Sequence, residues 1–309
     1  MIRKLNGTTA VITSATSGIG REPAIEFAKA GASVVIAGRR EERLNKLAAE
    51  IEAAGSKALA VVTDVADQAQ VDHLIESAVE RFGRIDSLVN NAGVAVAGRF
   101  NEMALEDFRR VMDVNFWGAV YASKAVVERM RKQRGGGVII NVSSIFGKRG
   151  VPFETAYCSS KFALAGFSEA LRAEVMSDGI DVSTIFPGAV ETEIFKSAAN
   201  QTGFELPSFV PKFPAKAMAK LIVQTARFPR PEVVMALDAQ AINLFNTLAP
   251  GLMDLALGWP FYRRNASRRS LVDEQRKSLS PIRREIDSRS TLKASTLESL
   301  EQNEGAKQK

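Results

Sequence analysis

The segment TTAVITSATSGIG (residues 8–20) places an apolar, β-branched run, a turn rich in Gly and Ser, and a helical pattern in direct succession. Gly18 and Gly20 lack a Cβ, so the backbone of this turn can approach a pyrophosphate group closely. The charge of such a group is favoured at the free N–H groups of a helix N-terminus. The segment therefore predicts the first strand, turn and helix of a phosphate-binding α/β fold.

Outward from this segment, short β-branched runs alternate with amphipathic helical patterns. The predicted strands are residues 8–13, 33–37, 58–63, 87–89, 137–142, 181–186 and 232–235. The predicted helices are residues 20–30, 40–54, 68–82, 104–131, 155–177 and 214–227. Strands joined through helices require right-handed crossovers and a parallel sheet. We expect one α/β domain, a Rossmann-type doubly wound sheet of about seven strands with helices on both faces.

Three segments depart from the domain expected over residues 1–236. Residues 192–214 carry Phe, Leu and Val among Pro and Gly, and we interpret them as a substrate loop with an apolar inner face. The apolar extension 237–262 is interrupted by Asp, Asn, Pro and Gly; we expect it to pack on the domain or on a second subunit, with an interfacial membrane contact as the alternative. Residues 263–309 contain no aromatic side chain, which predicts a disordered basic tail.

Composition and charge exclude several classes of function. The 309 residues are 46% hydrophobic and 25% charged, as in soluble globular proteins. One Cys and one His exclude a disulfide framework and a site built from several Cys or His ligands, so we expect no metal. No run of about 18 apolar residues and no apolar leader are present, which favours a cytoplasmic location.

The net charge of +6 is concentrated at the C-terminal end of the chain. Residues 263–309 hold 12 Lys or Arg against 7 Asp or Glu, which leaves the rest of the chain close to neutral. Binding of nucleic acid requires a basic footprint on the folded part. The charge pattern therefore gives nucleic-acid binding no support.

The second predicted strand ends at Gly38-Arg39-Arg40, where an NAD-binding fold places an acidic residue for the ribose 2′-OH. A guanidinium group at this position suits a 2′-phosphate instead. A charge-assisted hydrogen bond contributes about 1.5 to 3 kcal/mol, enough to decide between the two dinucleotides. We therefore expect NADP(H) rather than NAD(H).

Polar side chains follow the later strands. Asn90-Asn91-Ala92-Gly93 follows the fourth strand, Asn115 lies within the predicted helix 104–131, and Ser143-Ser144 follows the fifth strand. Tyr157 and Lys161 lie four residues apart and share one helical face. A phenol has a pKa of about 10, and we expect an adjacent ammonium and a cationic nicotinamide to bring it toward working pH. The alternatives are a chance Tyr-Lys spacing and a helix-capping role for Ser144.

Taken in order and at this spacing, these motifs identify a family resemblance. Residues 6–236 resemble the short-chain dehydrogenase/reductase family, which has a Thr-Gly-x-x-x-Gly-x-Gly turn, an Asn-Asn-Ala-Gly segment and a Tyr-x-x-x-Lys site. That family places a Ser thirteen residues before the Tyr, the separation of Ser144 and Tyr157. The resemblance implies reversible interconversion of a carbonyl and an alcohol.

The resemblance also implies roles for individual residues. The catalytic tetrad would be Asn115, Ser144, Tyr157 and Lys161, with Tyr157 as the acid/base and Asn115 holding a water that links Lys161 to a proton relay. The implied cofactor-binding residues are Thr13, Ser14, Ser17, Gly18, Ile19, Gly20, Arg39, Arg40, Asp64, Val65, Asn91, Ala92, Gly93, Tyr157, Lys161, Pro187, Gly188, Val190 and Thr192. Helices 104–131 and 155–177 resemble those with which the family forms dimers and tetramers.

Ser14 departs from the family pattern, because the first Gly of the turn usually stands there. If this position needs a positive φ, a Cβ costs about 1 kcal/mol, and we expect weakened rather than abolished cofactor binding. We expect an NADP(H)-dependent oxidoreductase that reduces a lipophilic ketone or aldehyde. The alternatives are a 3-oxoacyl-carrier-protein-type reductase and a non-catalytic NADPH-binding scaffold or sensor.

Overall fold

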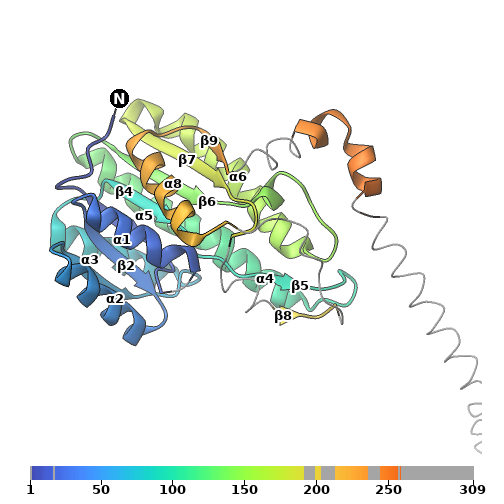
Figure 1. Cartoon of the computed structure of the whole chain (residues 1–309), viewed down its shortest axis with the longest axis horizontal. Helices are drawn as coiled ribbons and strands as arrows, with labels where there is room; N and C mark the ends of the chain where they lie inside the picture. The colour runs from blue at the N-terminus through green and yellow to red at the C-terminus, as the bar shows by residue number, and fades with distance from the viewer. Residues whose placement is uncertain are drawn as a thin grey trace, which may run out of the picture. The chain divides into compact units, whose positions relative to one another are not determined.

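The computed structural model describes residues 2–16, 18–190, 199–202, 213–235, 244–256 and 258. The chain divides into two compact units, residues 1–250 and 251–309. In the first unit, seven parallel strands form one sheet in the order β3-β2-β1-β4-β6-β7-β9 (Figure 1). These strands are β1 (Thr9–Ile12), β2 (Ser33–Gly38), β3 (Ala58–Val62), β4 (Ser87–Asn90), β6 (Gly137–Val142), β7 (Ile180–Phe186) and β9 (Glu232–Val234). The predicted fold class is confirmed.

Helices cover both faces of this sheet, as the sequence predicts. One face packs against α1 (Arg21–Lys29), α2 (Glu41–Ala53) and α8 (Ala215–Arg227), and the other against α3 (Gln68–Phe82), α5 (Gly118–Lys132) and α6 (Thr155–Val175). Within β1, Ala10 and Ile12 join the core that contains Phe27 of α1, whereas Val11 joins the core that contains Leu74 of α3. Strands buried on both faces are continuous apolar runs, which explains why the strand predictions agree with the structure to within two residues at each end.

The helix predicted over residues 104–131 is helical from Leu105 to Lys132 but contains a π-helical turn. The structure has α4 (Leu105–Met112), a π-helical turn η2 (Asp113–Trp117) and then α5. The turn carries the buried Asn115. Gly118 follows the π-helical turn and packs against the loop that precedes α3. A Cβ added to Gly118 would lie 2.9 Å from the Cβ of Val65. π-helical turns inside α-helices are frequent at functional sites, and this one aims Asn115 toward α6.

A second, two-stranded parallel sheet pairs β5 (Val96–Ala97) with β8 (Ala199–Asn200). It fastens the described part of the predicted substrate loop 192–214 to the segment after β4, and Gln201 extends the contact by donating to Asp107 of α4 at 2.7 Å. Phe213 forms a parallel bridge with Val190. The remaining residues of that loop lie outside the described residues, so its expected apolar inner face stays a prediction.

Only parts of the C-terminal segments are described. Residues 244–248 are helical in the first unit, and residues 251–256 are helical in the second, whereas the predicted tail 263–309 lies outside the described residues. None of the helices described is long and apolar enough to cross a membrane.

Candidate functional site

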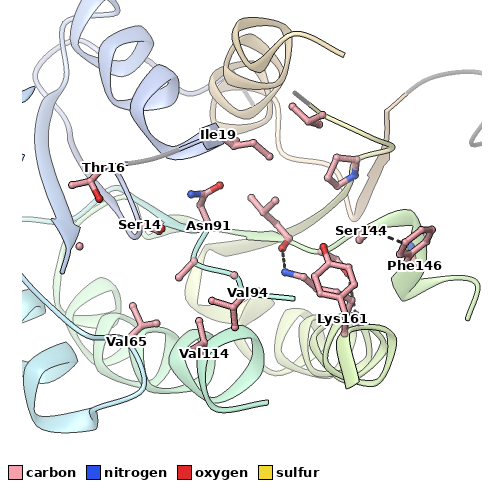
Figure 2. A pocket seen from close by; sticks show the side chains of 18 of the residues that line it. Ser14, Thr16, Ile19, Val65, Asn91, Val94, Val114, Ser144, Phe146 and Lys161 are labelled. Atoms are coloured by element: carbon pink, nitrogen blue, oxygen red, sulfur yellow. Dashed lines mark hydrogen bonds between the residues drawn. The ribbon is translucent and has the colours of Figure 1, made fainter. Parts of the chain in front are cut away.

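A cavity of about 380 Å³ opens at the carboxyl ends of the central strands. In a doubly wound sheet this edge is where ligands bind. Figure 2 shows Thr16 and Val65 toward one end of the cavity, and Ser144, Phe146 and Lys161 toward the other. The predicted cofactor-binding residues that line it are Ser14, Ile19, Arg39, Arg40, Asp64, Val65, Asn91, Ala92, Gly93, Tyr157, Lys161, Pro187, Gly188 and Val190. Ser17 and Thr192 lie outside the described residues.

The turn after β1 is built as its sequence predicts. Ser14 has a φ of 55°, which is the left-handed region that glycine favours. Ser14 therefore has a strained backbone conformation at the position where the family pattern has Gly. Ala15 then donates a backbone hydrogen bond to Ala37 of β2 at 2.9 Å, so the turn is fixed between two strands.

Gly20 allows this turn to close tightly on its own backbone. A Cβ built on Gly20 would overlap the carbonyl oxygen of Ser14 and lie 2.8 Å from Nδ2 of Asn91. Gly18 and Gly20 form the short 3-10 helix η1 (Gly18–Gly20) that leads into α1. Gly20 is therefore required for the turn to close on Ser14 and Asn91, which both line the cavity, whereas Gly18 and Gly20 do not. The helix N-terminus beside this turn is the kind of site that binds a pyrophosphate.

Thr13 does not line the cavity; it ties the two neighbouring loops together. Its Oγ1 accepts hydrogen bonds from the backbone N–H groups of Asn91 at 3.0 Å and Ala92 at 3.2 Å. Its carbonyl oxygen accepts from Nδ2 of Asn91 at 3.2 Å. Thr13 therefore sets the position of the loop after β4 against the turn after β1.

One end of the cavity is cationic. Arg39 lies 3.9 Å from Oδ2 of Asp64, and Nη2 of Arg40 donates to the carbonyl oxygen of Thr16 at 3.3 Å. The sequence predicts a helix that begins at Arg40. In the structure, Arg40 has an extended backbone and immediately precedes α2. The extended backbone leaves Arg40 on the loop that lines the cavity, beside Arg39.

At the other end, Ser144 joins a chain of hydrogen bonds. Its Oγ accepts from the backbone N–H of Phe146 at 3.2 Å, and its hydroxyl hydrogen-bonds the phenol of Tyr157. Ser144 is also the residue that caps the 3-10 helix η3 (Ile145–Gly147). The capping role of Ser144 is therefore compatible with its role beside Tyr157, because the cap fixes the direction in which the hydroxyl points.

Lys161 is buried one helical turn beyond Tyr157. Its Nζ donates to the carbonyl oxygen of Val142 at 2.9 Å and lies 5.6 Å from the centre of the Tyr157 ring. Burial lowers the pKa of Lys161 to about 8. The ammonium is therefore still the main form near neutral pH.

In the protein alone, burial is the main influence on the pKa of the Tyr157 phenol. Burial raises the pKa of Tyr157 above its usual range, and the hydrogen bond from Ser144 opposes only part of that shift. The nearby Glu154 adds to it. Desolvation of the phenolate is the largest cause, so the protein alone favours the protonated phenol. The expected shift toward neutrality beside a cationic nicotinamide stays a prediction.

Asn115 fastens α6 to the loop after β4. Its Oδ1 accepts from the backbone N–H of Val94 at 2.8 Å, and its Nδ2 donates to the carbonyl oxygen of Val94 and to Oγ of Ser160, both at 2.9 Å. The four predicted catalytic side chains therefore meet in one region, three of them on the cavity wall and Asn115 behind it.

Several residues of the site were not anticipated. Thr16, Val94, Arg110, Val114, Ile145 and Phe146 also line the cavity. Thr16 and Ile145 adjoin predicted motifs, and proximity along the chain could have indicated them. Arg110 and Val114 come from α4 and the π-helical turn, and no sequence signal places these elements over the cavity.

Comparison with known proteins agrees with this geometry. Residues 8–203 match the short chain dehydrogenase family. An uncharacterized oxidoreductase of Bacillus subtilis, YxnA, is 36% identical over 82% of this chain and 72% of its own length, and a 3-dehydrosphinganine reductase of Danio rerio is 35% identical over 80% and 73%. A crystal structure of a Burkholderia phymatum short chain dehydrogenase/reductase with NAD has a TM-score of 0.74 at 26% identity, and covers 82% of this chain and 97% of that one.

The family match extends across the Gly-rich turn, strands β1 to β7 and the Tyr-Lys pair. A family match of this extent carries the general chemistry with it, an oxidoreductase acting on CH–OH groups with a nicotinamide cofactor. This chain belongs to the short-chain dehydrogenase family.

Proposed function

We propose that this protein is an NADP(H)-dependent reductase of a lipophilic ketone or aldehyde, with Asn115, Ser144, Tyr157 and Lys161 as its catalytic residues. The observation that carries the proposal is one cavity with a proton donor at one end and paired arginines at the other. Ser144, Tyr157 and Lys161 line the first end, and Arg39 and Arg40 line the second. A dinucleotide that spans the cavity reaches both.

The chemistry follows from the hydrogen bonds of the site. A bound nicotinamide cofactor supplies the hydride to the carbonyl carbon. Tyr157 donates its phenolic proton to the carbonyl oxygen, which completes the alcohol. Ser144 turns its hydroxyl hydrogen from the phenol to the substrate oxygen, while its Oγ keeps the bond from Phe146. Lys161 stabilises the resulting phenolate until it is reprotonated.

Asn115 acts from behind this pair. Its amide holds Val94 on one side and Ser160 on the other, so it fixes the turn of α6 that carries Tyr157 and Lys161. In this position Asn115 holds the water that links Lys161 to the proton relay. The proposal gives Asn115 a role in reprotonation rather than a contact with substrate.

The cofactor preference rests on Arg39 and Arg40. Two guanidinium groups at the end of β2 favour a 2′-phosphate over a free 2′-hydroxyl. Asp64 lies 3.9 Å from Arg39 and reduces the net charge there. The Burkholderia structure was solved with NAD. The preference for NADP(H) over NAD(H) is therefore the part of this proposal that a binding measurement tests first.

The substrate class is proposed from apolar surroundings and from a relative. The ring of Phe146 lies 6.3 Å from that of Tyr157, Val94 and Val190 also line the cavity, and the zebrafish relative is named a 3-dehydrosphinganine reductase. A lipophilic carbonyl compound suits such a lining. The near-neutral charge of the chain before residue 263 gives no support to docking of an acidic carrier protein.

Association with a second copy or with a membrane surface is part of the proposal. Trp117 and Phe162 are each 44% exposed on the helices with which the family forms dimers. In the C-terminal extension, Leu244 and Leu248 are exposed and apolar. We propose that these exposed large apolar side chains are covered by a second copy or by a membrane surface.

Ser14 supports the one rival worth testing, a scaffold that binds cofactor weakly and does not turn over. Its φ of 55° carries a cost of about 1 kcal/mol for a residue with a Cβ. Calorimetric titration of the full chain with NADPH and NADH separates the two readings. The proposal requires NADPH to bind at least about tenfold more tightly than NADH; binding of neither would favour the scaffold.

A further inference from the structure

The short helical segment 244–248 is joined to the loop after β6 by one amide side chain. Oδ1 of Asn246 accepts a hydrogen bond from Nη1 of Arg149 at 2.9 Å. Nδ2 of Asn246 donates a hydrogen bond to the carbonyl oxygen of Lys148 at 3.3 Å. These two partners lie 97 and 98 residues earlier in the chain. The two bonds, the Asn246 clamp, therefore link this segment to a distant loop of the same unit.

The clamped loop is a single hydrogen-bonded turn, residues 144–149, which we name the Ser144 turn. The backbone N–H groups of Lys148 and Arg149 both donate to the carbonyl oxygen of Ile145 at 3.0 Å. The first three residues of the turn line the cavity. Because the bonds to Ile145 connect the two ends of the turn, a shift of Lys148 or Arg149 also moves the residues that line the cavity.

The Ser144 turn packs directly on α6. A Cβ added to Gly147 would lie 2.8 Å from the carbonyl oxygen of Lys161, so the turn and this helix are in close contact. The ring of Phe146 meets that of Tyr157 edge to face, with 6.3 Å between their centres, and it lines the cavity (Figure 2). The position of the turn therefore sets how much room a substrate has beside the phenol of Tyr157.

The side chain of Lys148 ties the same turn to the sheet. Its Nζ pairs with Glu232 of β9 at 2.9 Å and lies 4.3 Å from the centre of the Phe186 ring. This ion pair holds the side chain of Lys148, whereas the Asn246 clamp holds its backbone carbonyl and the side chain of Arg149. Hydrogen bonds to a charged group such as a guanidinium are stronger than neutral ones. The clamp is thus an anchor that the sheet does not supply.

We propose that Asn246 is a positioning residue that restricts the width of the ketone accepted, because it holds the Ser144 turn and keeps the ring of Phe146 beside Tyr157. The inference rests on the proposed function, since it concerns the substrate end of the same cavity. Asn246 does not line the cavity, so it acts through Phe146. Lys161 is held separately by its bond to β6. The clamp therefore affects the space for substrate rather than proton transfer.

The consequence is a preference among ketones. A linear methyl ketone needs little width next to its carbonyl group, whereas a ketone with an aromatic ring on each side needs the ring of Phe146 to move. Close packing makes such a movement costly while the clamp is in place. Without the clamp the movement costs less, so the discrimination between the two ketones becomes smaller.

The test compares full-length wild type with Asn246→Ala, which removes both bonds, and Asn246→Asp, which keeps the acceptor for Arg149 but lacks the donor for Lys148. Methyl octyl ketone is the linear substrate and benzophenone the wide one, with NADPH consumption as the readout. Hydrogen exchange of the peptide that contains residues 144–149 reports on the turn without any turnover. Asn45→Ala is the matched control, because Asn45 is an exposed amide on α2 that does not line the cavity.

In Asn246→Ala, the ratio of kcat/KM for methyl octyl ketone to that for benzophenone should fall about three- to tenfold. The change should come from a lower KM for benzophenone, while NADPH affinity and kcat for methyl octyl ketone stay at the wild-type values. Exchange in the Ser144 turn should become faster. Asn246→Asp should lie between Asn246→Ala and wild type, and Asn45→Ala should match wild type in every measurement.

An unchanged ratio in Asn246→Ala overturns the inference even if exchange becomes faster, because the clamp would then be structural only. A loss of kcat with both ketones to the same extent also overturns it. Wild-type protein that consumes no NADPH with either ketone overturns the proposed function instead. Hydrogen exchange still tests the clamp in that case, and unchanged exchange in Asn246→Ala would show that Asn246 does not hold the turn.

Discussion

The ammonium of Lys161 donates a 2.9 Å hydrogen bond to the carbonyl oxygen of Val142, the last residue of β6. This bond fixes one face of α6 against the carboxyl end of a central strand. Tyr157, one turn earlier on the same helix, is thereby held where Ser144 reaches it from the loop after that strand. Sheet and helix together define the reacting end of the cavity.

Replacing Arg39 by Asp should shift cofactor preference toward NADH. The side chain of Arg39 lines the cavity and is 65% exposed, so a phosphate can reach it beside Asp64, whereas an Asp suits a ribose hydroxyl. We expect NADPH affinity to fall about 10- to 100-fold, measured by calorimetric titration with both dinucleotides.

Arg109→Asp provides the control for this change. Arg109 is 67% exposed on α4 and does not line the cavity. The Arg109→Asp variant makes the same change of charge away from the cavity, so its ratio of NADPH to NADH affinity should stay at the wild-type value. An unchanged ratio in Arg39→Asp would refute the phosphate-binding role.

Gly20→Ala should disrupt the turn that follows β1. The new Cβ would overlap the Ser14 carbonyl oxygen and crowd Nδ2 of Asn91. We expect cofactor affinity to fall at least about tenfold and unfolding to become easier by about 1 to 3 kcal/mol. Gly166→Ala in α6 is the control, because no atom lies within 4 Å of its added Cβ. Equal binding by both variants would show that the turn does not contact the cofactor.

Glu154 should make the stability of the protein depend on pH. Its pKa is about 7 in the folded chain against an ordinary value of 4.5, so the folded state holds the extra proton between these pH values. The free energy of unfolding should therefore fall as pH rises from 4.5 to 7, by up to about 3 kcal/mol. Urea denaturation across this range should show the slope in wild type and a flatter one in Glu154→Gln.

Much of this fold could be predicted because its signals are local. Buried parallel strands are continuous apolar runs, and the loops after β1, β2, β3, β4, β6 and β7 line the cavity. The spacing between Ser144, Tyr157 and Lys161 is likewise visible along the chain. The sequence shows that Ser14 departs from the Gly of the family pattern. The structure gives Ser14 the positive φ that this departure makes costly.

What escaped prediction depends on contacts between distant segments. The π-helical turn interrupts a helix pattern that runs on through it, and the amide of Asn115 meets Val94 and Ser160 only after folding. The pairing of β5 with β8 joins segments about a hundred residues apart with two residues each. The raised pKa of Glu154 results from its burial, and no pattern of neighbouring residues predicts that burial.

The central claim is that Tyr157 gives the proton while a nicotinamide cofactor gives the hydride. The most direct measurement is NADPH consumption, followed by nicotinamide absorbance with a long-chain ketone, in wild type and in Tyr157→Phe. Tyr157→Phe removes one oxygen atom from a buried ring, so NADPH affinity should stay within about threefold. The account predicts steady NADPH consumption by wild type and at least a thousandfold lower rate in the variant. Appreciable consumption by Tyr157→Phe would contradict it.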